Sequence, residues 1–263
     1  MTSPSTEIIV PTFGQEAFTI PCFEALLAHT ESYRLVWVDN GSSAESRAAV
    51  TPHFASHRDR LAIWPASNLG FVGGTNLGLR AILDDPHSEA EYVVLLNNDT
   101  EVTPHWLERL VGALDRNPAL GAAGPLTSSS ASPHSWPMFL SAKGEPPPPS
   151  LDAASPAEVN RTLAERFGDL VVDVPMVAFF CTVFRKRVFR ELGLLDTRFG
   201  MGLADDNDYC VRLLRAGYGV ALVPGAYVVH HHRTTFRSIY SDAEISSMQN
   251  ENLARFRLKH GIS

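Results

Sequence analysis

Four short runs of apolar residues, each followed by turn-forming residues and then by a helical pattern, divide the first hundred residues of the chain. The runs lie at residues 7–10, 35–38, 61–64 and 92–96. Because they are nearly continuous in apolar character, they are typical of parallel strands that are covered on both faces. The repeated strand–turn–helix pattern predicts an α/β fold with a mostly parallel central sheet flanked by helices, in which ligands bind beyond the carboxyl ends of the strands.

The pattern of the chain changes after this first part. Residues 127–155 are rich in serine and include four successive prolines, so they predict a long loop, which is either a solvated insertion or a lid. Further on, we expect helices at 186–192 and 206–216, and two short strands at 220–223 and 227–229.

The sequence also predicts a closing amphipathic helix at residues 242–260. Its apolar residues recur at helical spacing and predict a buried face. The positions expected on this face are Ile245, Met248, Leu253, Phe256 and Leu258. A length of 263 residues fits one large α/β domain or two small ones and supports a buried core.

Composition and charge narrow the class of protein. The 22 basic and 29 acidic side chains give a formal charge of −7, which argues against nucleic acid as a general partner. Cys22, Cys181 and Cys210 lie far apart and are odd in number, so we expect reduced thiols in a cytoplasmic protein. The longest uncharged apolar run, at 174–184, is too short to span a bilayer, so no transmembrane segment is expected.

Polar or glycine-rich segments follow three of the predicted strands. Asp39 begins a turn that a strand-to-helix connection alone would explain, although its carboxylate could also accept a hydrogen bond from the imide N–H of a pyrimidine base. Residues 68–76 form a glycine-rich turn that opens a helix, which favours a bound anion but is a weak phosphate signal on its own. Asp99, after the run at 92–96, could bind Mg²⁺ or Mn²⁺, or simply lie in a turn.

Three carboxylates open the predicted helix near residue 206. The helix dipole stabilises an acidic residue near a helix N-terminus by roughly 0.3–1 kcal/mol, which accounts for one or two of Asp205, Asp206 and Asp208. Three within four positions repel one another, so a cation-binding or catalytic role is indicated. Their crowding should raise the pKa of at least one of them, which suits a general base.

A histidine cluster follows the last predicted strand. Alternation along the strand places His230 and His232 on one face and His231 on the other. A lone histidine at a strand end is usually structural, but three beside Arg233 favour a metal- or phosphate-binding role. The pattern alone does not select which histidine serves.

Taken in order, these motifs resemble those of the family 2 glycosyltransferases with the GT-A fold. The matching segments are IIVPTF at 8–13, VDNGSS at 38–43, NLGFVGGTN at 68–76, LLNNDT at 95–100, FRKRVFRELGLLDTRF at 184–199, DDNDYCVRLLRAGY at 205–218 and HHH at 230–232. The ordered set is specific and spans nearly the whole chain apart from 127–155. Bacterial rhamnosyltransferase-like and galactofuranosyltransferase-like members look most similar.

The resemblance implies one GT-A catalytic domain over residues 1–263. Residues 1–126 would form a nucleotide-binding half, 127–170 a loop or insertion, and 171–263 the acceptor and catalytic half with the closing helix. The donor-binding residues implied by the motifs are Pro11, Thr12, Asp39, Asn68, Gly73, Asn97, Asn98 and Arg233.

The resemblance also implies a metal site and a catalytic base. Asp99 stands in the family's DxD motif and would hold a divalent cation, Mn²⁺ or Mg²⁺, together with His230. Asn97 replaces the usual first acid and would contact the ribose. Asp206 matches the catalytic base of the family's Glu-Asp-x-Asp pattern, in which Asp205 replaces the Glu and Asp208 is the last acid.

The implied reaction is inverting transfer of a sugar from a nucleoside-diphosphate sugar to a hydroxyl of a glycan, a lipid-linked acceptor or a small molecule. A lipid-linked acceptor would require peripheral contact at the inner face of the membrane. One alternative is a nucleotidyltransferase, although residues 11–18 lack the basic side chains of a triphosphate-binding loop. Another is a non-catalytic glycan-binding GT-A protein, which Asn97 favours and the acidic cluster at 205–208 opposes.

Overall fold

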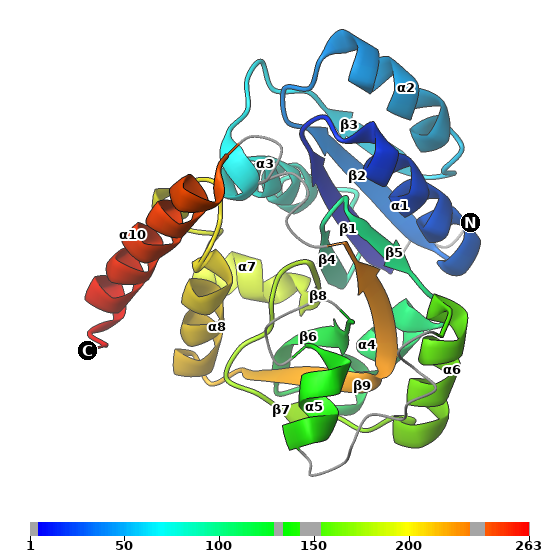
Figure 1. The fold of residues 1–263 in the computed structure, drawn as a ribbon, viewed down its shortest axis with the longest axis vertical. Helices are drawn as coiled ribbons and strands as arrows, with labels where there is room; N and C mark the ends of the chain where they lie inside the picture. Colours follow the sequence, from blue (N-terminus) through cyan, green and yellow to red (C-terminus); the bar gives the residue numbers. More distant parts are fainter. Residues whose placement is uncertain (1–4, 129–133, 143–153, 232–239, 263) are drawn as a thin grey trace.

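A computed structural model describes residues 5–128, 134–142, 154–231 and 240–262, and in it a central sheet carries helices on both faces (Figure 1). The strands are β1 (Thr6–Thr12), β2 (Tyr33–Asp39), β3 (Arg60–Ile63), β4 (Tyr92–Leu96), β5 (Thr100–Val102), β6 (Leu120–Leu126), β7 (Val172–Asp173), β8 (Cys181–Arg185) and β9 (Gly219–His230). The helices are α1 (Glu16–His29), α2 (Ala44–Ala55), α3 (Gly70–Leu83), α4 (Trp106–Arg116), α5 (Trp136–Ala142), α6 (Pro156–Phe167), α7 (Lys186–Leu192), α8 (Asp205–Arg215) and α10 (Asp242–His260), with a 3-10 turn, η2 (Thr197–Phe199).

The described strands form one sheet in the order β3-β2-β1-β4-β8-β6-β9-β5, with β7 paired to β9. The four strands predicted from the first hundred residues are parallel to one another. The sheet becomes mixed beyond β4, because β8 lies antiparallel between β4 and β6. Leu96 at the end of β4 pairs with Cys181 at the start of β8, so the segment that enters β8 reaches the edge where β4 ends.

The central strands are buried on both faces, which explains their continuous apolar runs. Successive residues alternate between two clusters: Ile8 and Val10 belong to one, and Ile9 to the other. The same alternation separates Trp37 from Val38 on β2. A fully buried aliphatic side chain contributes roughly 1.5–3 kcal/mol to folding, so the sheet is stabilised from both sides.

Two expectations for the second half of the chain are wrong. Residues 127–155 are not wholly a loop, because they contain α5, whose Trp136 and Leu140 are buried in the core. This helix contains Trp136, Met138, Phe139 and Leu140, which are apolar side chains within an otherwise Ser- and Pro-rich stretch. The two short strands expected at 220–223 and 227–229 are parts of one strand, β9, in which a register shift against β6 absorbs the Pro-Gly pair between them.

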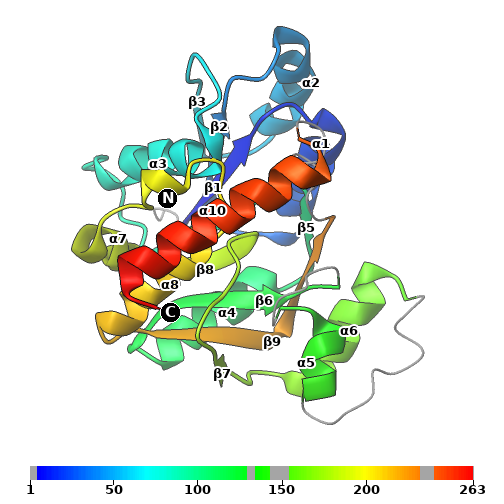
Figure 2. The same ribbon diagram turned by 60° about the vertical axis from the view of Figure 1, so that its left-hand side comes forward.

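The closing helix has the bounds that the sequence predicts, and its buried face agrees with the expected one in part, since Leu253 and Phe256 are partly buried against the core. Ile245 is buried as expected, whereas Leu258 is 87% exposed. Asn252 and His260 are buried in its place. Two views show α10 lying along α8 (Figures 1 and 2), and its contacts include ion pairs of Lys259 and His260 with Asp208, which apolar periodicity does not predict.

None of the helices in the described segments combines the length and the apolar character that crossing a bilayer requires.

Asp208 of α8 holds α10 in place through ion pairs with two residues near the end of α10. Its carboxylate is 1% exposed and lies 2.6 Å from Nζ of Lys259 and 2.7 Å from Nε2 of His260. Replacing Asp208 with alanine should lower the free energy of unfolding by about 3 kcal/mol, because the buried His260 and the partly buried Lys259 lose their shared acceptor. Urea denaturation measures this change.

A matched control is Asp169→Ala, whose carboxylate is 73% exposed and pairs with Arg116. Exposed pairs add little to stability, so this variant should unfold as the wild type does. Equal losses of stability in the two variants would show that α10 is not held by the Asp208 cluster.

Candidate functional site

The carboxyl ends of β1 and β2 lie side by side and carry the first expected site residues. Pro11 pairs with Val38 in register, and Thr12 pairs with Asp39. The Asp39 side chain is fully buried and accepts a hydrogen bond of 3.1 Å from the backbone N–H of Ser42. The parallel register therefore fixes the position of this carboxylate at the edge of the sheet.

The sequence analysis did not predict the basic side chain that lies beside Asp39. Arg47 of α2 makes an ion pair with the Asp39 carboxylate. The Arg47 guanidinium also lies 5.3 Å from the ring centre of Trp64, a side chain that is 55% exposed at the end of β3. A basic residue in the first turns of the helix after a strand-end aspartate is the signal that could have revealed this pair.

Asn40 ties the Asp39 turn to the glycine-rich stretch. Its Nδ2 donates to Oδ1 of Asn68 at 3.0 Å and to the backbone oxygen of Gly70 at 2.9 Å. Asn68 Oδ1 also accepts from the N–H of Gly70 at 2.8 Å, at the start of α3. A Cβ on Gly73 would lie 2.6 Å from the Cβ of Leu69, so the tight start of α3 requires glycine there. Asn68 is thus brought to the turn that contains Asp39 and Asn40, as expected, and Gly73 lies in the first turn of α3 that follows.

The motif after β4 separates into residues with different partners. Asn98 is buried and its Nδ2 donates to Thr19 of α1 at 2.9 Å, so this amide holds α1 rather than facing outward. The Asn97 side-chain oxygen is buried and has no hydrogen-bond partner within the described residues. A buried acceptor of this kind is costly unless a ligand or water satisfies it.

Asp99 and His230 come together from adjacent strands. The register of β5 and β9 places residue 100 opposite His230, and Asp99 Oδ1 lies 3.3 Å from His230 Nε2. Both side chains are less than one tenth exposed. A carboxylate oxygen and an imidazole nitrogen at this separation can bind one divalent cation.

The strand alternation correctly separates the histidines. His231 points to the other side of β9, where its Nε2 lies 2.7 Å from Oε1 of Glu101 and its ring lies beside Phe18. His232 and Arg233 lie outside the described residues. The described geometry therefore selects His230, and not His231, as the neighbour of Asp99.

Phe180 connects this pair to β4. Its ring stacks on that of His230, with centroids 4.7 Å apart and planes 8° from parallel. Its backbone oxygen accepts from the N–H of Asn97 at 2.8 Å. His134 supports the same segment, because its Nε2 accepts from the N–H of Ala178 at 2.7 Å while Nδ1 donates to the Pro125 oxygen at 2.6 Å.

Burial lowers the pKa of His134 to about 4, so the ring is neutral at neutral pH and can make both of these bonds. This role of His134 was not predictable from the sequence, because His134 lies in the stretch expected to be a loop.

Asp205 and Asp206 begin α8. Burial, and next the neighbouring Asp206 charge, raise the pKa of Asp205 above its ordinary value. Burial likewise raises the pKa of Asp206, against the opposing hydrogen bond of 2.8 Å from the N–H of Asn207. The crowding inferred from the sequence therefore has the expected sign, although desolvation is the larger cause.

The loop before α8 lies against the glycine-rich start of α3. The N–H of Val72 donates to the backbone oxygen of Gly200 at 3.1 Å. A Cβ built on Gly202 would lie 3.5 Å from both Asp205 Oδ1 and Phe71. These contacts join the glycine-rich stretch to the first acid of α8.

Asp208, expected in the catalytic group, is directed elsewhere. Its carboxylate binds Lys259 and His260 of α10, as described above. Asp208 thus lies on the side of α8 that faces α10, where its carboxylate makes ion pairs that hold the two helices together.

Comparison with known proteins identifies the family. The model of the family described as glycosyl transferase family 2 matches residues 7–193. The chain therefore belongs to glycosyl transferase family 2, and it is a glycosyltransferase with the GT-A fold. This result leaves the nucleotidyltransferase alternative without support.

Two kinds of mycobacterial relative are similar in sequence. An uncharacterized protein of Mycobacterium tuberculosis is 27% identical over 236 residues, which cover 88% of this chain and 76% of the relative. The pre-mycofactocin glycosyltransferase of the same organism is 26% identical over 214 residues, which cover 81% of this chain but 40% of that protein.

Two solved structures share the fold. The mannosyltransferase PcManGT from Pyrobaculum calidifontis, in complex with GDP-Man and Mn²⁺, superposes with a TM-score of 0.66 at 16% identity, over 100% of this chain and 66% of the other. GalNAc-T7 with UDP, GalNAc and Mn²⁺ superposes with a TM-score of 0.62 at 13% identity, over 86% of this chain and 43% of the other. This chain thus spans less than half the length of the GalNAc-T7 chain.

The raised pKa of Asp205 has a consequence for stability. A carboxyl with a raised pKa in the folded state contributes stability that is fully present below about pH 4 and is lost as the pH rises through the folded-state pKa. Asn at position 205 stays neutral, so Asp205→Asn should raise the unfolding temperature relative to wild type at pH 8 and change it little at pH 4. Thermal unfolding at a series of pH values measures the difference. A gain that is equal at both pH values would contradict the assigned burial.

Proposed function

We propose that this glycosyltransferase transfers a sugar from a nucleoside-diphosphate sugar to an acceptor hydroxyl with inversion, and that Asp206 is the general base. The observation that carries the proposal is the pair of carboxyls with raised pKa values at the start of α8, the buried Asp205 and the half-buried Asp206, joined through the loop before α8 to the glycine-rich turn. A base whose pKa is raised toward neutrality accepts a proton more effectively.

The nucleoside diphosphate would bind along the edge where β1, β2 and β4 end. The Asp39–Arg47 pair and the exposed Trp64 ring offer charge and an aromatic surface to the nucleoside. The buried Asn97 oxygen would accept a hydrogen bond from a ribose hydroxyl. The N-terminus of α3, opened by Asn68, favours the negative charge of the diphosphate.

Asp99 and His230 would hold a divalent cation. Their mixed oxygen and nitrogen donors fit Mn²⁺ better than Mg²⁺, which prefers oxygen ligands alone. The described residues contain no cluster of three or more metal-binding side chains, so diphosphate oxygens and water would complete the coordination. Such a cation neutralises negative charge on a leaving diphosphate.

In the proposed reaction, the Asp206 carboxylate accepts the proton of the acceptor hydroxyl. The freed oxygen forms a bond to the anomeric carbon while the bond from that carbon to the diphosphate oxygen breaks. The products are a glycoside of inverted configuration and the nucleoside diphosphate. Burial raises the pKa of Asp205 to about 8, so near neutral pH the pair holds one proton and one negative charge, and the two carboxyls titrate as a pair rather than separately.

Replacement of the base tests the proposal. Asp206→Asn should lower kcat by on the order of 10²–10⁴-fold, because it removes general-base catalysis while keeping the size of the side chain. The affinity for the nucleoside diphosphate should stay nearly unchanged. Release of nucleoside diphosphate in the presence of acceptor measures kcat, and isothermal calorimetry measures binding.

The matched control for this variant is Asp173→Asn, on the exposed short strand β7. It should retain wild-type kcat. If Asp206→Asn also retains kcat, Asp206 is not the base.

Metal dependence has its own test. Removal of divalent cations with EDTA should abolish transfer and weaken nucleoside-diphosphate binding, and Mn²⁺ should restore both. Asp99→Asn should require more Mn²⁺ for half-maximal activity, since an amide is a weaker ligand than a carboxylate. Full activity in EDTA would contradict the assignment of Asp99 and His230 as metal ligands.

A further inference from the structure

The loop that leads into α8 has a backbone conformation that its own residues do not favour. Leu203 and Ala204 both have positive φ, at 68° and 76°, immediately before Asp205. Side chains with a Cβ rarely adopt this region, and such residues persist where surrounding contacts hold them. Contacts from outside the loop therefore fix where Asp205 and Asp206 begin the helix.

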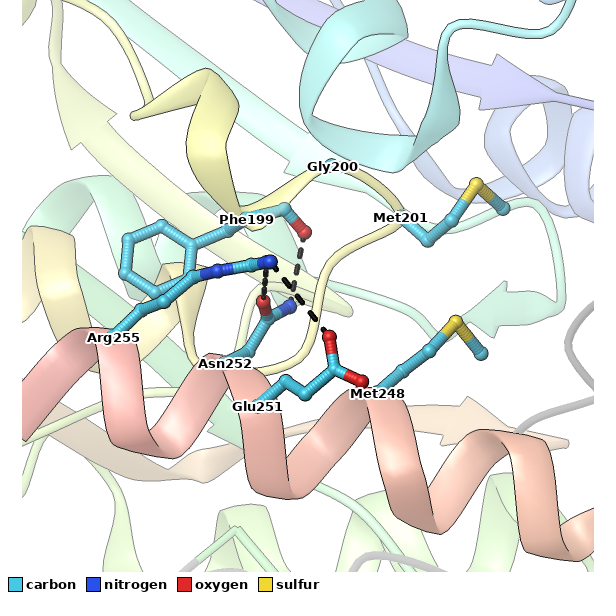
Figure 3. A pocket seen from close by; sticks show the side chains of 7 residues that line it. All are labelled: Phe199, Gly200, Met201, Met248, Glu251, Asn252 and Arg255. Atoms are coloured by element: carbon cyan, nitrogen blue, oxygen red, sulfur yellow. Dashed lines mark hydrogen bonds and ion pairs between the residues drawn. The ribbon is translucent and has the colours of Figure 1, made fainter.

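One side chain of α10 supplies two of these contacts. Asn252 is 5% exposed, and its Nδ2 donates to the backbone oxygen of Phe199 at 3.1 Å and to that of Gly202 at 2.7 Å. Its Oδ1 accepts from Nη1 of Arg255 at 2.8 Å. Both amide protons and the amide oxygen are thus satisfied, and Figure 3 shows the Asn252 side chain reaching from α10 to Phe199.

We propose that Asn252 is a positioning residue for catalysis, which holds residues 199–204 against α10 so that Asp205 and Asp206 stay at the site. This inference rests on the proposed role of Asp206. It assigns a function to α10, which lies beyond the residues matched by the family model.

The rest of α10 keeps Asn252 in place. Arg255 also donates to the backbone oxygen of Arg198 at 3.1 Å, and Glu251 pairs with Arg255 on the surface (Figure 3). At the far end, Lys259 joins Asp196 at 2.7 Å as well as Asp208. The helix is therefore bound to the chain on both sides of the loop, before η2 and within α8.

A general contribution to helix stability does not explain why position 252 is an asparagine. Asparagine is a weaker helix former than alanine or leucine, and a buried amide is favourable only when its hydrogen bonds are made. Here the bonds go to two carbonyls of one loop, three residues apart, and thereby define its path.

The test compares Asn252→Ala with Asn250→Ala, an exposed asparagine two positions earlier on the same helix. In the full-length protein, Asn252→Ala should lower kcat by on the order of 10–100-fold, because a small displacement of a catalytic group has such an effect. The KM for the donor should stay within about twofold, a margin that corresponds to a small change in binding free energy. Turnover is normalised to active sites counted by nucleoside-diphosphate binding.

Arg255→Ala is the milder variant, because it removes the partner of Asn252 Oδ1 and leaves the two bonds to the loop possible. It should give an intermediate loss of kcat. Leu110→Ala, which removes a fully buried side chain of α4, provides a variant of lowered stability that should keep normalised kcat. An equal loss of normalised kcat in Leu110→Ala would overturn the positioning role.

Hydrogen exchange tests the same inference without any assay of activity. Asn252→Ala should accelerate exchange of backbone amides at residues 200–206 and leave β1 and β4 unchanged, whereas Asn250→Ala should change neither. Unchanged exchange in this loop, or unchanged kcat in Asn252→Ala, would overturn the inference. Wild-type protein that neither transfers nor hydrolyses any nucleoside-diphosphate sugar would overturn the proposed function instead, and the exchange result would still decide whether Asn252 holds the loop.

Discussion

A backbone contact that only glycine permits joins the two halves of this protein. Gly70 has a φ of +73°, and a Cβ built on it would lie 2.6 Å from the oxygen of Gly200. The N–H of Val72 bonds to that same oxygen. Because Gly70 opens α3 and Gly200 lies in the loop before α8, this contact sets how far the carboxylates of α8 lie from the glycine-rich turn. The arrangement of the proposed site depends on it.

Four carboxylates of the protein, those of Asp39, Asp205, Asp206 and Asp208, differ in their partners, and the difference separates acids held in ion pairs from the acids proposed for catalysis. Asp39 and Asp208 each pair with a basic side chain. Asp205 and Asp206 make no ion pair with any basic side chain of the described segments, and burial raises their pKa values. Protein interiors do not favour such uncompensated acids, and sites that need a proton acceptor near neutral pH are where they are expected.

The sequence predicted the strands and the polar residues at their ends because each rests on a local signal. Continuous apolar runs identify strands buried on both faces, and residues after parallel strands collect at one edge. The place of Asp208 was not predictable in this way, because charge density does not reveal which side of α8 faces α10. The role of Asn252 was not predictable either, because its partners are backbone carbonyls some fifty residues away in sequence. Contacts of this kind produce no pattern of residue types along the chain. His134 was hidden by the loop-like composition around it.

The most direct measurement is a crystal structure with Mn²⁺ and a nucleoside diphosphate, in which anomalous scattering locates the cation. The account predicts one strong peak between Oδ1 of Asp99 and Nε2 of His230, in contact with diphosphate oxygens, and a carboxylate of Asp206 that faces the open side of the diphosphate. A cation bound elsewhere, or an Asp206 side chain turned away from the diphosphate, would contradict it.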